Sequence, residues 1–172
     1  MEMVEILTLR AMQGIYLLLG TNLGDRKANL DRAIQLIDAK GITVIQTSSI
    51  YETAAWGIED QPGFLNQVIR VDTQLPAERL LSILLAIELE MGRVRIQKWG
   101  ERLIDIDILY YHDEVIDKED LQVPHPGIPD RRFTLVPLVE LDAAAMHPVL
   151  QKSQQELLEV CKDELEVKAW GR

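Results

Sequence analysis

Two aspartates alternate with isoleucines in the stretch Ile104-Asp105-Ile106-Asp107-Ile108. Successive side chains of a strand leave opposite faces, so Asp105 and Asp107 project together while the isoleucines enter a core. Aspartate is poorly suited to strands, and two carboxylates on one face need a compensating partner. Mg²⁺ is commonly held by one or two carboxylates together with substrate phosphates. The pair therefore predicts a metal site, and the alternative is an edge strand that carries two solvated acids.

A basic segment comes directly before this strand. It contains Arg93, Arg95, Lys98 and Arg102, which are four of the 18 lysines and arginines in the chain, and Glu101 is the one acid among them. The whole chain has a formal net charge of −10, so this positive island indicates a small anionic ligand such as a chain of phosphates. The alternative is a solvated loop whose charges form surface ion pairs.

Two aromatic side chains and an amide indicate a place for a planar ligand. Phe64 and Asn66 are two residues apart on a predicted strand, so they share a face, and Phe133 follows a second basic pair. A base-sized ring gains roughly 1–3 kcal/mol by stacking on one aromatic side chain, and an amide offers a donor and an acceptor to its edge. The alternative places Phe64 in the core and makes Asn66 a cap at the strand end.

Three further places in the sequence, at His125, at Arg131-Arg132 and at Trp99, have either a binding or a structural interpretation. His125 stands between two prolines that stiffen its loop, where it could contact a phosphate or exchange a proton near neutral pH, although a single histidine is more often structural. Arg131 and Arg132 form a second basic pair, of which one is expected to reach the ligand while the other stays in solvent. Trp99 either covers a nucleotide or anchors its loop by packing.

The elements that must position these residues follow from periodicity and turn signals. The apolar run 15–19 predicts a strand, and helical spacing of apolar residues predicts helices over 25–40 and 76–91. Strand character returns over 42–51, 64–71 and the aspartate stretch, with a loop over 52–62. The order strand, helix, strand, strand, helix, strand predicts an α+β fold with a ferredoxin-like βαββαβ core, in which helices cover one face of an antiparallel sheet.

The remainder of the chain extends this core. Residues 114–116 are expected to form a short hairpin arm, and Ser153 with Glu156 makes a capping box that predicts a helix near the C-terminus. We expect a single domain over 1–172, with a dispensable leader at 1–13, a core at 14–142 and a C-terminal helical extension at 143–172.

Composition narrows the classes of function. A chain of 172 residues with 47% hydrophobic residues can bury a core of its own. The acidic balance argues against nucleic acid and against an anionic membrane as partner. The single cysteine, Cys161, excludes an internal disulfide and a cysteine-based zinc site. No apolar run is long enough to span a bilayer, so we expect a cytoplasmic protein, and we expect it to be a monomer.

Taken together, the motifs resemble those of the 6-hydroxymethyl-7,8-dihydropterin pyrophosphokinases, the folate-pathway enzymes that move pyrophosphate from ATP to a pterin alcohol. The resemblance extends from Ile15 to about Leu141. It rests on Gly20-Thr21-Asn22-Leu23-Gly24, on Gln61-Pro62-Gly63-Phe64-Leu65-Asn66, on Gly92-Arg93-Val94-Arg95 with Trp99 to Asp107, and on Val123-Pro124-His125-Pro126 with Arg131-Arg132-Phe133.

The resemblance implies a role for each matching position. Asp105 and Asp107 would bind two Mg²⁺ ions that bridge the ATP phosphates and the attacking hydroxyl, and together with Arg93 and Arg102 they would be the catalytic residues. The implied ATP site comprises Glu88, Arg93, Arg95, Trp99, Arg102, Ile108, His125 and Arg131. The implied pterin site comprises Thr53, Ala54, Trp56, Phe64, Asn66 and Phe133.

The sequence thus leads to one main hypothesis and one rival. In the main hypothesis, the pterin hydroxymethyl oxygen attacks the β-phosphorus of ATP in line and AMP leaves, a reaction that needs positioning and charge neutralisation more than covalent help. In the rival, the chain is a non-catalytic ferredoxin-like module that binds a nucleotide and regulates a partner. The rival predicts binding without turnover.

Overall fold

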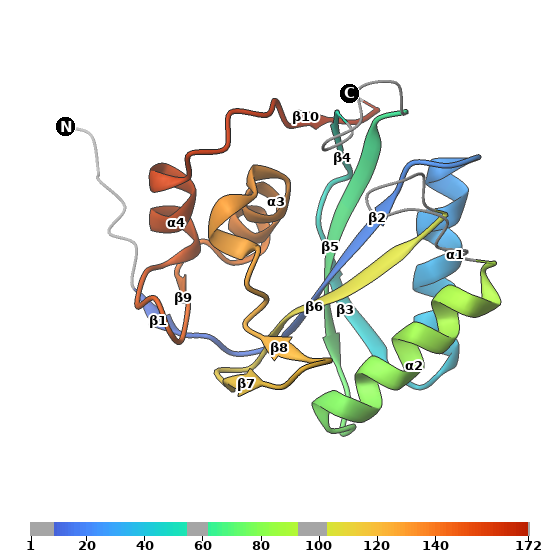
Figure 1. The fold of residues 1–172 in the computed structure, drawn as a ribbon, viewed down its shortest axis with the longest axis horizontal. Helices are drawn as coiled ribbons and strands as arrows, with labels where there is room; N and C mark the ends of the chain where they lie inside the picture. Colours follow the sequence, from blue (N-terminus) through green and yellow to red (C-terminus); the bar gives the residue numbers. More distant parts are fainter. Residues whose placement is uncertain (1–8, 55–61, 93–102, 172) are drawn as a thin grey trace.

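A six-stranded sheet forms the centre of the protein in the computed structural model, which describes residues 9–54, 62–92 and 103–171 (Figure 1). The central strand β2 (Ile15–Thr21) pairs antiparallel with β5 (Phe64–Asp72) on one side and with β6 (Asp105–Tyr111) on the other. The outer edge of β5 pairs with β3 (Thr43–Thr47) and then with β4 (Tyr51–Thr53), and β4 in turn pairs with β10 (Lys168–Ala169). All of these pairings are antiparallel, so this part of the sequence-based prediction is confirmed.

Two helices cover one face of the sheet. They are α1 (Arg26–Ala39) and α2 (Ala77–Glu90), and Figure 1 shows both on the same side. Asp25 caps α1, because its side chain accepts a hydrogen bond from the Ala28 amide. The buried stripes of these helices join the isoleucines and leucines of β2, β5 and β6 in one apolar core.

Two further helices, which come after the predicted βαββαβ core in the sequence, cover the other face of the sheet. Helix α3 (Arg132–Asp142) and helix α4 (Gln154–Val160) pack on the opposite face and build a second apolar core with Tyr16, Val68 and Tyr110 (Figure 1). Helix α3 carries Pro137 in its interior, a residue that argues against a helix in sequence terms. The capping box that predicted α4 is present, since Ser153 and Glu156 bond each other's backbone amides.

The single strand expected over 42–51 is two strands in the structure. Between β3 and β4, the Ser48 amide donates to the Val68 carbonyl, and the Ser48 hydroxyl accepts from the Val68 amide. The pairing of β3 with β5 also contains a register shift between Val44 and Gln46. The bulge and the serine contacts interrupt the regular ladder, so β4 begins as a separate strand at Tyr51.

Part of the segment that we expected to be a leader is built into the fold. Strand β1 (Arg10–Ala11) pairs in parallel with β9 (Ala145–Met146), and Arg10 forms an ion pair with Asp142 of α3. The next residue, Met12, is only 2% exposed and belongs to the second core. Burial of an apolar side chain is the physical reason that this stretch is ordered.

A short hairpin leads from the sheet to the remaining part of the site. Strands β7 (Ile116–Asp117) and β8 (Gln122–Val123) pair antiparallel and are followed by a 3-10 turn over Ile128–Asp130. Arg131 follows this turn at the N-cap position of α3, and Phe133 lies in the first turn of the helix. None of the helices in the described part of the chain has the length and apolar character that a bilayer crossing requires.

Candidate active site

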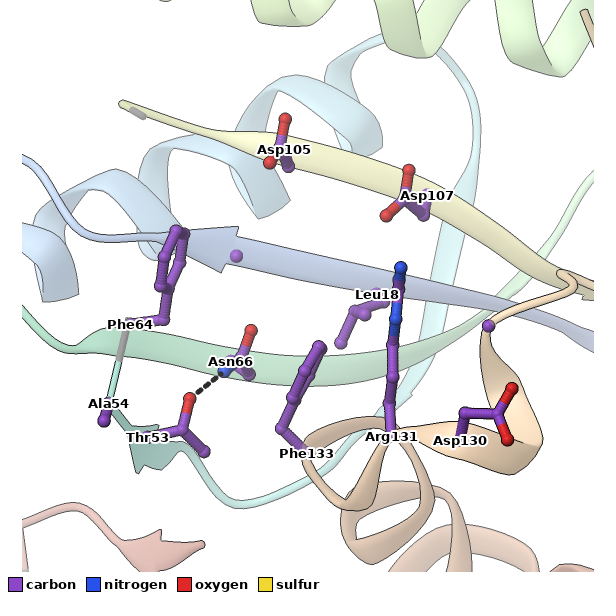
Figure 2. Close-up of a pocket in the computed structure, with 12 residues that line it drawn as sticks. Leu18, Thr53, Ala54, Phe64, Asn66, Asp105, Asp107, Asp130, Arg131 and Phe133 are labelled. Atoms are coloured by element: carbon purple, nitrogen blue, oxygen red, sulfur yellow. Dashed lines mark hydrogen bonds between the residues drawn. The ribbon is translucent and has the colours of Figure 1, made fainter. Parts of the chain in front are cut away.

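A cavity of about 350 Å³ opens between the sheet and the start of α3 (Figure 2). Its walls come from four strands and from the segment 127–133, which contains the 3-10 turn and the start of α3. Eight of its lining residues are among those that the sequence singled out, and they are Thr53, Ala54, Phe64, Asn66, Asp105, Asp107, Arg131 and Phe133. Chain segments that are far apart in sequence therefore meet in one place.

The carboxylate pair lies on the cavity side of β6. Asp105 and Asp107 are half-buried and line the cavity, whereas Ile104, Ile106 and Ile108 are buried in the core on the other side. This arrangement follows from the two-residue period of a strand. Figure 2 shows both aspartates projecting from β6 above β2 and β5.

Gly20 on the neighbouring strand keeps the space beside Asp105 open. It pairs with Asp105 across β2 and β6, and with Asn66 across β2 and β5. A Cβ atom at this position would lie 3.2 Å from the Asn66 Oδ1 and 4.0 Å from the Phe64 ring. A larger residue would therefore project into the cavity between the carboxylates and the aromatic wall.

The aromatic wall has an amide at its centre. Phe64 and Phe133 flank Asn66 in Figure 2, and all three line the cavity. The Asn66 side chain is buried, and its Nδ2 donates to the Thr53 Oγ1 at 3.3 Å. This bond fixes the amide, so its edge is held toward the space between the two rings. The arrangement suits a flat ligand with hydrogen-bonding groups on its rim.

Arg131 brings a positive charge into the same cavity. Its guanidinium lies over the Phe133 ring at 5.9 Å, a cation–π geometry that also orients the ring. The guanidinium packs so closely against Gly127 that a Cβ there would lie 2.8 Å from the Arg131 Cζ. Gly127 thus leaves room for the arginine side chain.

His125 is held beside the cavity but does not line it. Its backbone amide donates to the Leu109 carbonyl at 2.9 Å, and its Nδ1 accepts from the Gly127 amide at 3.0 Å. The pKa of His125 is lowered, mainly because the ring is buried. The positive charge of Arg131 also lowers the pKa, and the negative charge of Asp107 opposes the shift. Because Nδ1 is an acceptor, the neutral ring carries its proton on Nε2.

Two other expected ATP contacts lie away from the cavity wall. Glu88 of α2 is buried, and its Oε1 accepts from the Ile106 amide of β6 at 2.8 Å. The side chain of Ile108 is in the first core. Glu88 therefore fixes β6, the strand that carries both aspartates. The Ile108 side chain packs on the face of β6 opposite to the aspartates. The remaining expected residues, Trp56, Arg93, Arg95, Trp99 and Arg102, lie outside the described residues.

Sequence reasoning missed four residues that line the cavity. They are Leu18, Gly20, Gly127 and Asp130. The strand period would have identified Leu18 and Gly20, since alternate residues of β2 face the same side as the cavity. Gly127 and Asp130 belong to a loop, and no periodicity in the sequence predicts their direction.

The donor set fits a hard divalent cation that also contacts phosphate. In the part of the chain that the structure describes, no group of three or more histidine, cysteine, aspartate or glutamate side chains could hold a metal. Two carboxylates on one strand are nevertheless the protein contribution that Mg²⁺ commonly has when substrate phosphates complete its coordination. Asp105 and Asp107 match this pattern in type and in placement.

A family model and two relatives that match this chain all carry the description of a pterin pyrophosphokinase. Residues 16–143 match the family model described as 7,8-dihydro-6-hydroxymethylpterin-pyrophosphokinase. The chain is 41% identical over 145 residues to the 2-amino-4-hydroxy-6-hydroxymethyldihydropteridine pyrophosphokinase of Aquifex aeolicus, covering 84% of this chain and 90% of that protein. It is 39% identical over 156 residues to the enzyme of the same name from Bacillus subtilis, covering 90% and 89% of the two chains.

The fold is similar to that of solved structures as well. A crystal structure of Plasmodium falciparum HPPK-DHPS with pteroate superposes with a TM-score of 0.66 at 18% sequence identity. The superposition covers 84% of this chain and 41% of the Plasmodium chain, so the present chain spans less than half of that protein. At this identity the likeness establishes the fold.

Proposed function

This chain belongs to the 7,8-dihydro-6-hydroxymethylpterin-pyrophosphokinase family, and we propose that its cavity is where the family's reaction takes place. The protein transfers pyrophosphate from ATP to the hydroxymethyl group of 6-hydroxymethyl-7,8-dihydropterin in folate biosynthesis. The products are AMP and the pterin diphosphate. The observation that carries the assignment of the site is that the carboxylate pair and the aromatic wall line one cavity of about 350 Å³.

The aromatic wall binds the pterin in this proposal. Phe64 and Phe133 stack on its two faces, and Asn66 and Thr53 bond its edge. Ala54 lines the same wall, and Trp56, which lies outside the described residues, follows it in the sequence. The support is the fixed amide between two rings and the apolar surface around it. This arrangement directs the hydroxymethyl group toward β6.

The carboxylates and arginines bind the triphosphate. Asp105 and Asp107 hold Mg²⁺, with two ions expected, and Mg²⁺ when bound neutralises phosphate charge. Arg131 contacts a phosphate from the cavity wall, and Arg93, Arg95 and Arg102 are proposed to do so from the preceding segment, with Trp99 on the nucleotide. His125 contributes an Nε2–H donor, since its Nδ1 already accepts the Gly127 amide. Glu88 and Ile108 act by positioning β6.

The bond changes follow from this placement. The pterin hydroxymethyl oxygen forms a bond to the β-phosphorus, and the bond between that phosphorus and the oxygen bridging to the α-phosphorus breaks. AMP leaves with the bridging oxygen, and the hydroxyl proton passes to solvent. Arg131 and the aspartate site hold the donor in line with the attacking oxygen, so the chain contributes orientation and charge stabilisation.

We propose that the core has the ferredoxin-like topology, which is supported by the strand order β6, β2, β5 and then β3, with a helix after β2 and another after β5. We also propose that the protein acts as a monomer. Elution in size-exclusion chromatography at 19.6 kDa would support the monomer.

The direct test is product analysis with both substrates. The purified protein is mixed with ATP, Mg²⁺ and 6-hydroxymethyl-7,8-dihydropterin, with controls that lack each component. AMP and the pterin diphosphate are then quantified, and we expect them in equal amounts. Release of ADP would indicate transfer of a single phosphoryl group and contradict the proposal. Tight binding of ATP with no AMP would favour the rival, a non-catalytic nucleotide-binding regulatory module, which the named relatives do not favour.

The carboxylate pair provides the sharpest test of the site. Asp105→Asn and Asp107→Asn should each lower kcat by roughly a hundredfold or more, because the lost charge no longer supports the transition state of phosphoryl transfer. Their unfolding midpoints should stay near that of the wild type. Asp113→Asn, an exposed position just beyond β6, is the matched control and should remain active. Near-normal turnover in either site variant would remove the carboxylates from the mechanism.

A further inference from the structure

The C-terminal segment after α4 links two walls of the cavity, the start of α3, which carries Phe133, and the end of β4, which carries Thr53. Residues 161–170, which we call the strap, lie beyond the part of the chain that matches the family model, residues 16–143. In Figure 1 the strap, in red, leaves α4, passes over α3 and ends beside β4. It therefore touches both elements that carry pterin-binding residues, and its contacts with each are specific.

The first contact of the strap caps helix α3. No side chain at the N-cap position, Arg131, bonds the first turn of this helix. Instead, the Asp163 Oδ2 accepts from the Arg132 amide at 3.0 Å, and the Asp163 Oδ1 accepts from the Leu165 amide at 3.0 Å. A carboxylate at a helix N-terminus satisfies an amide that has no partner within the helix and is favoured by the helix dipole. Asp163 performs this function from 31 positions away in the sequence.

The capped amide lies immediately before a wall residue. Phe133 follows Arg132 in the first turn of α3, and its ring forms one side of the cavity. The backbone position of this turn sets where the ring stands relative to Asn66. Loss of the cap frees the first turn, where helices fray most readily, so the Phe133 ring would lose part of its fixed placement.

The second contact of the strap extends the sheet at β4. Strand β10 pairs antiparallel with β4, with Lys168 opposite Glu52 and Ala169 opposite Tyr51. The Trp170 amide then donates to the Ile50 carbonyl at 2.9 Å. Strand β4 ends at Thr53, which bonds the Asn66 side chain inside the cavity. The strap thus holds the other wall through backbone hydrogen bonds.

We propose that the strap sets the separation of the two walls of the pterin cavity, and that Asp163 is a positioning residue for Phe133. The proposal rests on the function argued above, and it assigns to this segment a role in pterin affinity. Asp163 does not touch the cavity, since it is absent from the residues that line it. It acts through the first turn of α3.

The proposal predicts a specific kinetic pattern for Asp163→Ala. The KM for the pterin should rise roughly five- to tenfold, the range that corresponds to loss of one helix cap, while kcat and the KM for ATP stay within about twofold. The dissociation constant for the pterin, measured from the quenching of protein fluorescence, should rise by the same factor. Hydrogen exchange at the Arg132 amide should become faster.

Two companion variants separate positioning from general destabilisation. Asp163→Asn keeps an oxygen that can accept the Arg132 amide, so it should recover most of the pterin affinity. Glu164→Ala removes the same charge from the adjacent exposed position and should behave as the wild type. If Asp163→Ala raised the KM for both substrates equally, or if Glu164→Ala had the same effect, the positioning role would be wrong.

A second pair of variants tests the strap at its other end and serves if Asp163→Ala fails to fold. Trp170→Pro removes the amide that bonds the Ile50 carbonyl, whereas Trp170→Ala keeps it. The proline variant should raise the KM for the pterin several-fold, and the alanine variant should not. Absence of AMP from the wild type would refute the proposed function. An active wild type with unchanged pterin affinity in Asp163→Ala and Trp170→Pro would refute the strap alone.

Discussion

His147 is a buried histidine whose surroundings favour the neutral form of its ring. It is 5% exposed, its Nδ1 accepts from the Val149 and Leu150 amides, and its ring packs edge-on against Tyr110. Burial lowers its pKa below the ordinary value of 6.5. The unfolded chain therefore binds a proton at a higher pH than the folded chain, and stability falls as the pH drops from about 6.5 through the folded pKa.

Removing the titration should flatten this slope. We expect His147→Asn, which retains an acceptor for the two amides, to lose less stability than the wild type between pH 7 and pH 5 in urea unfolding experiments. Equal slopes for the wild type and His147→Asn would show that burial of this ring does not contribute to the acid sensitivity.

The sequence identified single site residues where the side-chain type and the two-residue period of a strand agreed. The alternation of Asp105 and Asp107 with isoleucine predicts their common face from local geometry alone. The meeting of Phe64 with Phe133 depends on the path of a chain 69 positions long, which no local pattern specifies. The resemblance to a family supplied that information, and the cavity brings the two rings together.

At the scale of elements, Glu140 joins α3 to the sheet. Its carboxylate accepts from the Ser49 amide and hydroxyl and from the Tyr51 hydroxyl, with the shortest of these bonds at 2.7 Å. These contacts fix α3 against the point where β3 gives way to β4. Helix α3 and strand β4 are thus linked twice, directly by Glu140 and through the strap, and both links reach residues 49–52.

Loss of the Glu140 carboxylate should loosen this junction. Glu140→Ala is expected to lower the free energy of unfolding by about 1 kcal/mol, the usual net contribution of one intramolecular hydrogen bond, because these bonds are exposed to competing water. Glu159→Ala, an exposed glutamate on α4, should change it by less than about 0.5 kcal/mol. Chemical denaturation followed by circular dichroism measures both. A Glu140→Ala variant as stable as the wild type would assign the α3 position to apolar packing alone.

The elements that the sequence predicted are those with strong local signals. Helices α1 and α2 have apolar residues at helical spacing, and α4 has its capping box. Helix α3 lacks a side-chain cap of its own and contains Pro137, so its N-terminus depends on Asp163 from a distant segment. The break between β3 and β4 likewise depends on a serine that bonds Val68 across the sheet. Tertiary contacts decided both cases, and propensity alone gave no signal.

For the whole molecule, the central fact is a sheet whose central strand, β2, is buried on both faces. Every residue of β2 is buried, because its alternate side chains enter the two different cores. This explains why 15–19 reads as a continuous apolar run and not as an alternating one. The site lies where the second face is left open, between the start of α3 and the ends of the strands. The second core therefore supports one wall of the cavity.

The N-terminal segment contributes to that second core, so its removal should affect the whole fold. Met12 is 2% exposed, and Met12→Ala should lower the free energy of unfolding by roughly 2–5 kcal/mol through lost burial and a residual cavity. Leu9→Ala, at a position 46% exposed, is the matched control and should change it by less than about 0.5 kcal/mol. Because both cores share β2, circular dichroism and tryptophan fluorescence should report the same shifted transition in urea. If Met12→Ala were as stable as the control, residues 1–12 would be dispensable for folding, as a leader is. The stability of the second core would then depend on the packing of α3 and α4 against the sheet and not on Met12.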